Sequence, residues 1–474
     1  MQLFKVIFLF EWRRLIRQPA QLLILFFFLL LGLFSIYNGH TFLNRQLKAI
    51  DSLHKIQSLH LKDVKERFKA DTTTAWGKSL AMQAGIPQVI EFNNPPYAIN
   101  PPTSIAMLAV GQRDLLPYFD LVNSKRNYST PPDTEIANPE KLASGNFDLS
   151  FILIYLFPLL IIVWCYDILS SEREQQTDKL LSVQGASLNA IINYKLLFRL
   201  MVVLGLASLL SCIGFLAHPA PVILSAADAF VWLLLIVVYI TFWFALCRFI
   251  IKFNYSSAAN ILILPGIWLL FTVLIPSLAN KFTELAFPMP FRAGLASEQR
   301  EITIETWEMP RLALMDTFYK NNPQYLSIRK TTDTAEYGNK RFAAYEDLLL
   351  RRIRSSAAKY YTQVNRHNDV LTKLNWINPV AQIQYLLNAD TETGLKDYLS
   401  FEQQVNSFQT TWVGFINSYL LLDKKIKKEE LGLLPQFHKQ SDPLKTQRIL
   451  ISTASIWLAL LIILQITPKL RTRN

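Results

Sequence analysis

Several motifs that would mark an enzyme are absent from these 474 residues. No G-x-x-x-x-G-K-[ST] phosphate loop occurs, so the chain cannot hydrolyse ATP by that route. The H-E-x-x-H motif of zinc proteases and the G-x-S-x-G motif of serine hydrolases are absent as well. The histidines are scattered, and His54 and His60 lie six residues apart, which does not place both on one helical face. An enzyme is therefore the least expected class, and no catalytic or metal site is predicted.

Cysteine is scarce, and Cys165, Cys212 and Cys247 all lie in or at the ends of apolar runs. No disulfide is therefore expected to hold the long polar loops together. The apolar runs also contain almost no ionisable residues. Asp167 and Asp228 lie near their ends, where a boundary role is expected rather than a proton relay. This lack of charge favours a lipid-like or peptide-like cargo, or no cargo within the membrane.

A basic stripe interleaved with aromatic residues is missing, although the formal net charge is +12. A nucleic-acid groove needs such a stripe, so no nucleic-acid partner is expected. We attribute the excess charge to membrane flanks and solvated helix faces.

What the sequence does contain is six apolar runs long enough to cross a bilayer, in a chain of which 51% is hydrophobic. We predict transmembrane spans at 19–42, 148–168, 196–217, 228–247, 258–279 and 447–467. The first run, "AQLLILFFFLLLGLFSIY", is too long for a signal-peptide core and lacks a small-residue cleavage pattern. We interpret it as an anchor that is retained.

Lysine and arginine in short flanks set the expected orientation. The link "AHPAPVILSAAD" after the third span has neither residue, whereas three other segments flanking the spans are basic. These are Lys5, Arg13, Arg14 and Arg17 before the first span, Arg248 and Lys252 after the fourth, and Lys469, Arg471 and Arg473 in the tail 468–474. The pattern predicts a multi-pass membrane protein with both termini in the cytoplasm. The lack of cysteine in the long loops fits a protein of the bacterial inner (cytoplasmic) membrane.

Residues 1–18 alternate apolar and basic positions at helical spacing, which predicts a helix on the inner membrane surface. The residues expected to face lipid are Phe4, Ile7, Phe8 and Leu15, with Arg14 and Arg17 in water and Pro19 opening the first span. An unstructured basic flank is the alternative.

Two long segments, 43–147 and 280–446, are predicted to be extracytoplasmic and mostly α-helical. Apolar residues from Leu43 to Val64 recur in steps of three and four, so the first helix should continue out of the membrane. "NNPPYAINPP" cannot be helix interior, and "NWINPV" should separate two long helices. Whether the two segments form one domain stays open.

Three prolines, Pro158, Pro265 and Pro276, fall inside or at the ends of predicted spans. Each removes a backbone donor and frees a carbonyl, so each predicts a bend or break.

A charged stretch, "DILSSEREQQTDKLLSVQGASLNAIINYKL", joins the second and third spans. Ser170 or Ser171 could cap a helix over 170–184, with Glu172 and Glu174 in its first turn. Further along, Leu180 and Leu181 offer an apolar patch, Gly185 breaks the helix and Lys195 stands at the base of the third span. The pattern favours a cytoplasmic helix, within 169–195, on which a soluble ATPase docks. A plain solvated loop is the alternative.

This stretch resembles the permeases of ATP-binding-cassette (ABC) transporters of the type-2 exporter class. The resemblance rests on Glu172, Arg173, Glu174, Thr177, Gly185 and Lys195. Gln176 departs from the pattern, because many members have glycine there. "NPEKLASGNFDLSFILIYLFPLLII" and "NWINPVAQIQYLLNADTETGLKDYLSFEQQV" resemble a bacterial, Bacteroidota-like subgroup with a large extracytoplasmic domain of unassigned function.

The resemblance implies an all-α membrane protein with six transmembrane helices and two mostly helical extracytoplasmic insertions. It implies a dimer with a second permease, identical or related, and two copies of a nucleotide-binding ATPase subunit. ATP and magnesium would bind to that subunit, so no cofactor is expected in this chain. The ATPase-coupling helix would contain Glu172, Arg173, Glu174, Thr177, Leu180, Leu181, Gly185 and Lys195. Relatives include permeases linked to copper-enzyme maturation and to gliding motility.

Three functions remain open. The chain could be the permease subunit of an ATP-driven exporter. It could be a mechanical transmitter that uses the same ATPase to act on an envelope protein without moving cargo. It could also be a membrane receptor or scaffold with no ATPase.

Overall fold

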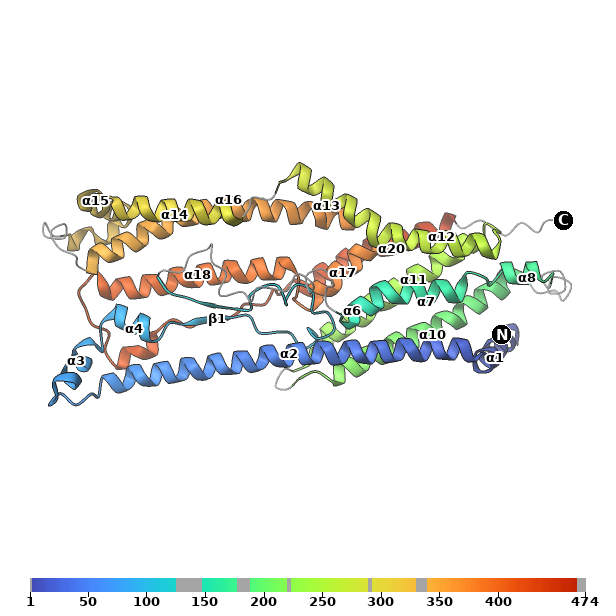
Figure 1. Cartoon of the computed structure of the whole chain (residues 1–474), viewed down its shortest axis with the longest axis horizontal. Helices are drawn as coiled ribbons and strands as arrows, with labels where there is room; N and C mark the ends of the chain where they lie inside the picture. The colour runs from blue at the N-terminus through green and yellow to red at the C-terminus, as the bar shows by residue number, and fades with distance from the viewer. Residues whose placement is uncertain are drawn as a thin grey trace.

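The computed structural model describes residues 2–124, 147–176, 188–219, 223–288, 292–329 and 339–466. Within these ranges the chain is almost entirely helical, and the one pair of strands is β1 (Tyr97–Ile99) with β2 (Phe119–Leu121). The two strands are antiparallel, with Ala98 opposite Asp120. The molecule is elongated, with a bundle of apolar helices at one end and a second helical region at the other (Figure 1). The prediction of an all-α membrane protein is confirmed.

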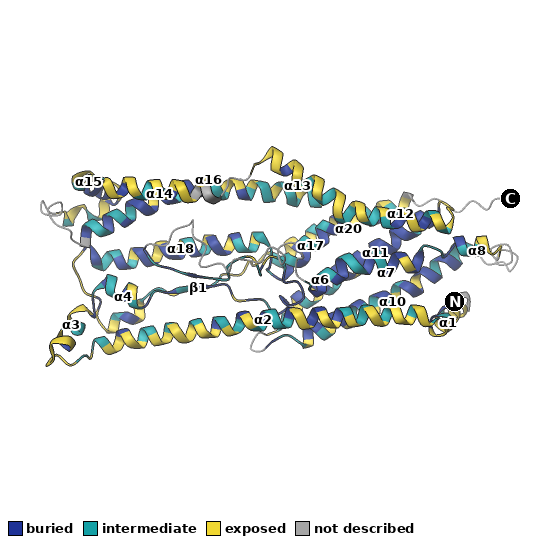
Figure 2. Ribbon diagram, in the orientation of Figure 1, coloured by how far each residue is buried: buried dark blue, intermediate teal, exposed yellow. Residues whose placement is uncertain are grey.

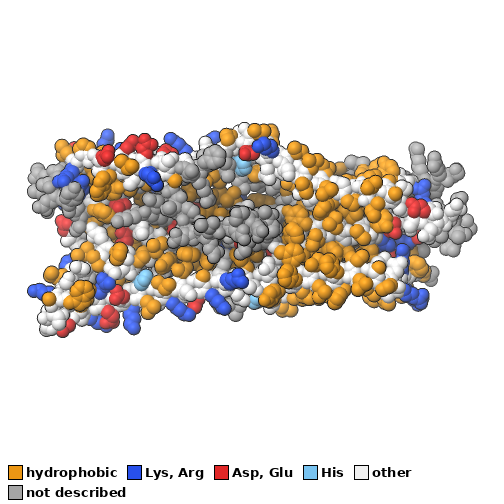
Figure 3. Space-filling model, in the orientation of Figure 1, with side chains coloured by type: hydrophobic (Ala, Val, Ile, Leu, Met, Phe, Trp, Pro, Cys, Tyr) orange, Lys and Arg blue, Asp and Glu red, His pale blue; other side chains and the backbone are white. Residues whose placement is uncertain are grey.

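Six helices in the described part of the chain are long and apolar enough to cross a bilayer. Spans one to six are Pro19–Arg67, Leu149–Glu174, Leu188–Leu216, Ala226–Ile251, Ser257–Ala286 and Lys445–Gln465. Hydrophobic side chains cover the half of the molecule that holds these spans, and charged side chains gather on the other half and at the end beside the N-terminus (Figure 3). The chain is therefore a transmembrane protein.

Three of the six spans consist of more than one helical element, and three are single helices. Span one is α2 (Pro19–Arg67), span three α10 (Leu188–Leu216) and span four α11 (Ala226–Ile251). Span two contains α6 (Leu149–Phe151), a π-helical turn η1 (Ile152–Leu156), α7 (Phe157–Cys165) and α8 (Ser170–Glu174). Span five contains α12 (Ser257–Leu269), a π-helical turn η2 (Leu270–Leu274) and α13 (Ile275–Ala286), and span six α19 (Lys445–Ser452) and α20 (Ala454–Ile466).

Both π-helical turns lie just before a proline. Pro158 follows η1 by two residues, and Pro276 follows η2 by two residues. Because proline has no N–H, it cannot donate the helical hydrogen bond to the carbonyl four residues earlier, and the ladder widens locally. The prolines thus interrupt the regular helix at two of the three predicted positions, whereas Pro265 lies inside α12, which continues through it.

Neighbouring spans supply the hydrogen bonds that span two lacks around Pro158. The hydroxyl of Tyr239 in α11 donates to the Ile154 carbonyl at 2.7 Å, and the indole N–H of Trp268 in α12 donates to the Tyr155 carbonyl at 3.1 Å. Water is absent from a bilayer core, so a freed carbonyl must be satisfied by protein. These two contacts fix spans four and five against the irregular turn of span two.

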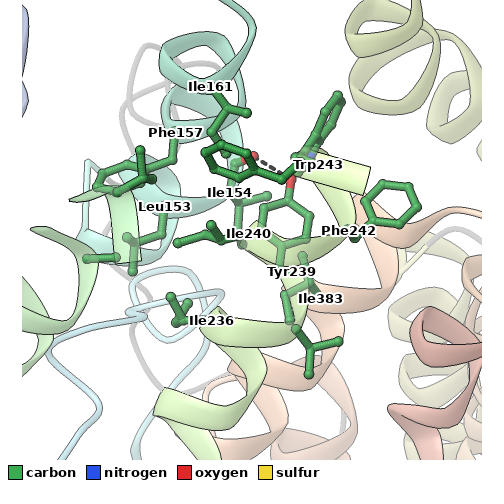
Figure 4. Packing of buried hydrophobic residues seen from close by; sticks show 14 of the residues in the cluster. Leu153, Ile154, Phe157, Ile161, Ile236, Tyr239, Ile240, Phe242, Trp243 and Ile383 are labelled. Atoms are coloured by element: carbon green, nitrogen blue, oxygen red, sulfur yellow. Dashed lines mark hydrogen bonds between the residues drawn. The ribbon is translucent and has the colours of Figure 1, made fainter. Parts of the chain in front are cut away.

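Span four forms the centre of the bundle. The rings of Tyr239 and Trp243 are fully buried among side chains of span two, including Phe157 and Ile161, and Ile383 of α17 (Pro379–Asp390) lies close by (Figure 4). In its most apolar stretch 72% of residues are buried, against 6% in span five. Figure 2 shows the same contrast between α11 and α12. Span five therefore presents most of its apolar surface to its surroundings.

Span one continues far beyond the bundle, as the sequence predicted. It begins at Pro19 and runs 49 residues to Arg67 without interruption. At about 1.5 Å per residue the helix is about 74 Å long, more than twice the thickness of a bilayer core. Gly39 is where α2 meets the 105–109 loop, since a Cβ there would collide with the Met107 carbonyl. The continuous helix α2 thus runs from the bundle into the other end of the molecule.

The extramembrane region comprises the elements beyond the spans at the end opposite α1 (Gln2–Arg17). In addition to the outer part of α2 and the two strands, it holds α3 (Ala75–Gln83), α4 (Pro87–Asn93), α14 (Arg292–Glu308), α15 (Arg311–Asn321), η3 (Pro323–Ile328), α16 (Asn339–Asn375), α18 (Leu395–Leu420) and η5 (Glu429–Leu433), and α17 lies at its junction with the bundle. Two long helices, α16 and α18, lie where the sequence predicted them. The chain between them turns at Asn378, whose side chain accepts a hydrogen bond from Val380 N at 3.0 Å.

The two predicted insertions pack against each other. The indole of Trp412 donates to Glu91 at 2.9 Å, and Ile426 N donates to the Gly85 carbonyl at 2.8 Å. The first insertion is less helical than predicted, because residues 94–124 form loops and the two short strands. The prolines of "NNPPYAINPP" exclude helix there.

The N-terminal helix α1 exists and Arg17 is exposed as predicted, but the apolar residues expected to face lipid pack on protein instead. Ile7 and Leu15 are buried, and the rings of Phe4 and Phe8 pack on Tyr194 and Phe198 of α10 at centroid distances of 5.5 and 5.0 Å. The exposed apolar side chains are instead Val6, Leu9, Phe10, Trp12 and Ile16. Periodicity alone could not distinguish a face packed on protein from one in lipid, since both are apolar.

Candidate functional site

The charged stretch after span two begins with the short helix α8. It ends at Glu174, and Gln176 has a left-handed φ of 59°, which interrupts the continuous helix predicted for 170–184. Leu169 occupies the N-cap position without a side-chain hydrogen bond, so the predicted capping by Ser170 or Ser171 does not occur. The Ser170 hydroxyl instead forms a hydrogen bond with Ser257 Oγ of α12 at 2.7 Å.

Glu172 and Lys195 connect the end of span two to the start of span three. Lys195 Nζ lies 2.6 Å from Glu172 Oε1. The Lys195 side chain is 8% exposed and that of Glu172 25%. A lysine so buried needs a partner for its charge, and Glu172 supplies it.

The next two residues of α8 bind the start of span five. Arg173 Nη1 donates to the Asn254 carbonyl at 3.0 Å. The Glu174 carboxylate accepts from Ser257 N at 2.9 Å and from Ser257 Oγ at 3.0 Å. Glu174 thereby places a negative charge at the N-terminus of α12, where unpaired N–H groups and the helix dipole favour it.

A buried ion pair connects α1 to span three at the same end of the bundle. Arg199 Nη2 lies 3.6 Å from Glu11 Oε2, and both side chains are only 4% exposed. Arg199 also donates to the Trp164 carbonyl of α7, and Arg14 lies 3.9 Å from Glu11 Oε1. The pair therefore joins α1, span two and span three at one point.

We call Glu172, Arg173, Glu174, Lys195 and Ser257 the span clasp. Through these five residues, α8 is bonded to span three on one side and to span five on the other. All four of the predicted coupling residues in the described ranges take part, and their contacts are within the chain. The other four, Thr177, Leu180, Leu181 and Gly185, lie outside the described residues. The span clasp therefore connects the end of span two directly to spans three and five.

Sequence reasoning missed Glu11, Asn254, Ser257 and Asn260. Glu11 is the one acid in an apolar and basic stretch of 18 residues, which is a recognisable sign of a buried partner. Ser256 and Ser257 precede an apolar run, which is typical of a helix N-terminus. Asn260, whose side chain donates to the Tyr166 carbonyl at 2.9 Å, had no comparable signal.

The described residues contain no group of three or more histidine, cysteine or acidic side chains placed to hold a metal ion. The contacts of the site are ion pairs and hydrogen bonds that join helices.

Similarity to known proteins is confined to the extramembrane region. Residues 294–440 match a family model described as a domain of unknown function, DUF3526. The matched range begins in α14 and ends after η5, so it includes none of the six spans. No curated protein and no solved structure matches the chain.

Proposed function

We propose that this protein is the transmembrane permease subunit of an ABC exporter, driven by ATP hydrolysis in a separate subunit. The span clasp is the observation that carries the proposal. It joins three spans through one short helix at the end of the bundle where the connection 169–195 lies. A subunit that moves this connection thereby acts on half of the spans at once.

The ATPase would contact the chain at the residues that follow α8. Thr177, Leu180, Leu181 and Gly185 are the proposed contacts, as the family resemblance implies. ATP binding would shift this segment, and Glu172 would pass the shift to span three through Lys195. ATP and magnesium would bind to the partner, so the permease needs no cofactor of its own.

The distribution of charge supports a bacterial inner-membrane location with both termini in the cytoplasm. Basic residues of α1 and the basic pair Arg248 and Lys252 lie at the same end of the bundle as the span clasp (Figure 1). The short link between spans three and four, at the other end, has no lysine or arginine. This is the arrangement that positive flanks on the cytoplasmic side produce.

A second permease, identical or related, is the proposed partner in the membrane. Span five supports this, because its apolar stretch is 6% buried, the least of the six. Lipid or a neighbouring span must cover this surface.

A mechanical transmitter is the second candidate, and α2 favours it. This helix runs without interruption from the bundle to Arg67 in the extramembrane region, so motion at one end reaches the other. The surface of span five carries a shallow depression lined by glycine and apolar residues, including Ile263, Leu270 and Leu274, with no charged side chain. In this alternative an envelope protein would receive the motion.

Co-purification tests the proposal. The full-length protein, isolated from its native membrane, is expected to carry a companion subunit with a phosphate-loop motif and ATPase activity. A preparation with neither would refute the proposal. A complex that hydrolyses ATP while its spans remain sealed throughout would favour the transmitter over the exporter.

A further inference from the structure

Five charged side chains gather where α17 ends beside the first turns of α11 and α19. They are Asp228 of α11, Asp390 at the end of α17, Glu392 in the following turn, Lys439, and Lys445 at the start of α19. We call them the junction cluster. It lies where the extramembrane region meets spans four and six, at the opposite end of the bundle from the span clasp.

Two acids of the junction cluster, Asp228 and Glu392, form ion pairs with its two lysines. Lys445 Nζ lies 3.1 Å from Asp228 Oδ1 and 3.5 Å from Glu392 Oε1. Lys439 Nζ lies 2.6 Å from Glu392 Oε2. Asp228 and Glu392 thus hold both lysines, whereas the carboxyl of the third acid, Asp390, makes no ion pair among the described residues.

The Asp390 carboxyl has no hydrogen-bond partner among the described residues, although the residue is 0% exposed. Lys445 does donate to Asp390, but to its backbone carbonyl, at 2.9 Å. Asp390 is also the last residue of α17, where the helix dipole disfavours a negative charge. An ionised carboxylate that is buried, unpaired and placed at a helix C-terminus is strongly unfavourable.

We propose that Asp390 is a proton-binding site, occupied when α17 is docked against spans four and six and emptied when that junction opens. A neutral carboxyl removes the uncompensated charge and leaves Asp228 and Glu392 to hold the lysines. The ligand is a proton rather than a metal, because no three acidic, histidine or cysteine side chains among the described residues are placed to hold a metal ion.

The electrostatic environment agrees with this assignment. Burial raises the pKa of Asp390 to about 8; Lys445 opposes the rise, and Asp228 and Glu392 add to it. For Glu392 burial acts in the same direction, but Lys439 and Lys445 outweigh it and lower its pKa. The two neighbouring acids are therefore held in opposite protonation states near neutral pH.

Other charged groups interact with members of the cluster or with residues next to it. Asp397 of α18 accepts from Gly394 N at 3.2 Å, and burial followed by the charge of Glu392 raises its pKa to about 6. Arg113 faces Glu392. The remaining groups are Tyr385, Asp369 and the ion pair of Arg448 with Asp442.

The pH dependence of folding stability has a defined sign. The folded chain keeps a proton on Asp390 up to about pH 8, whereas an unfolded aspartate loses it near pH 4. The proton therefore contributes stability that is present at low pH and is lost as pH rises from about 4 to about 8. The site makes docking of the extramembrane region sensitive to pH, whether or not an ATPase binds at the other end.

The test compares melting temperatures of the full-length protein in nanodiscs across this pH range. We expect Asp390→Asn, which mimics the neutral acid, to lose most of the fall in melting temperature and to exceed the original protein at about pH 9. The matched control Asp397→Asn should keep the fall between about pH 6 and about pH 8, since the pKa of Asp397 is about 6. Parallel profiles for Asp390→Asn and the original protein would overturn the proposal.

A second measurement covers the case in which the variant does not fold. In the unaltered protein with isotope-labelled aspartate, infrared spectroscopy should detect a protonated aspartate at pH 7 that ionises near pH 8. An aspartate spectrum that is wholly ionised at pH 7 would overturn the proposal independently of any variant.

Discussion

Lys195 Nζ lies 2.6 Å from Glu172 Oε1, across the connection between spans two and three. The lysine is the more deeply buried partner, at 8% exposure against 25%. The two residues are 23 positions apart in the chain, and the contact makes the end of one span dependent on the start of the next. Because Lys195 is buried more deeply than Glu172, removing one or the other side chain should lower the folding stability by different amounts.

Removing Glu172 should destabilise the fold more than removing Lys195. Glu172→Ala leaves a buried ammonium without a partner, which costs about 3–5 kcal/mol. Lys195→Met keeps the apolar stem and leaves a carboxylate with partial access to water, so its cost should be smaller. Thermal unfolding of both single variants and the double variant measures this. A larger cost for Lys195→Met would contradict the expected order of the two costs, and additive effects would show that the pair is not coupled.

Glu174→Lys should uncouple ATP hydrolysis from movement of the spans without preventing assembly. The substitution replaces two hydrogen bonds to Ser257 with a positive charge at the N-terminus of α12. The measurement is ATP-dependent activity of the complex alongside the amount of ATPase bound. Gln175→Lys is the matched control, because it adds a positive charge at the adjacent exposed position. Equal activity in both variants would exclude a role for Glu174.

Tyr239→Phe should destabilise the protein by about 1–3 kcal/mol, because a buried carbonyl then lacks its donor. The hydroxyl is the group that bonds the Ile154 carbonyl, which the proline at 158 leaves without its helical partner. The phenylalanine ring fills the same space, so packing is retained. Thermal unfolding in detergent gives the size of the effect. Stability equal to that of the original protein would show that η1 satisfies the Ile154 carbonyl by itself.

Glu11→Ala should loosen α1 from the bundle, with a cost of about 3–5 kcal/mol for the buried Arg199 left unpaired. Protease sensitivity within residues 2–17 should rise before the rest of the chain is cleaved. Exposed Arg13→Ala is the control, and it should not change the cleavage rate. An unchanged rate in Glu11→Ala would contradict the anchoring role of the pair.

Much of the architecture could be predicted from the sequence because hydrophobicity and proline act locally. Six apolar runs gave the spans, and Pro19 and the proline-rich "NNPPYAINPP" marked a helix start and a helix-free segment. The continuation of α2 to Arg67 followed from steps of three and four. Each of these features depends on residues within one or two helical turns.

The contacts of the site could not be predicted in the same way. The sequence motif identified Glu172, Arg173, Glu174 and Lys195 as candidate site residues. It gave no sign that Ser257, more than 80 residues later, forms hydrogen bonds with the Glu174 carboxylate. The apolar residues of α1 were wrongly expected to face lipid for the same reason: whether Ile7 meets lipid or protein depends on where α10 lies. The partner of Glu174 and the buried face of α1 both depend on tertiary contacts between distant parts of the chain.

The central claim is that a separate ATPase moves this chain through the connection that α8 begins. The most direct measurement is the distance between spin labels on α13 of span five and α11 of span four, which the span clasp does not bind, by pulsed electron paramagnetic resonance, in the native complex with and without ATP and magnesium. We expect nucleotide to shift the distance distribution, and Glu174→Lys to abolish the shift while the ATPase stays bound. An identical distribution with and without nucleotide, in a complex that hydrolyses ATP, would contradict the account.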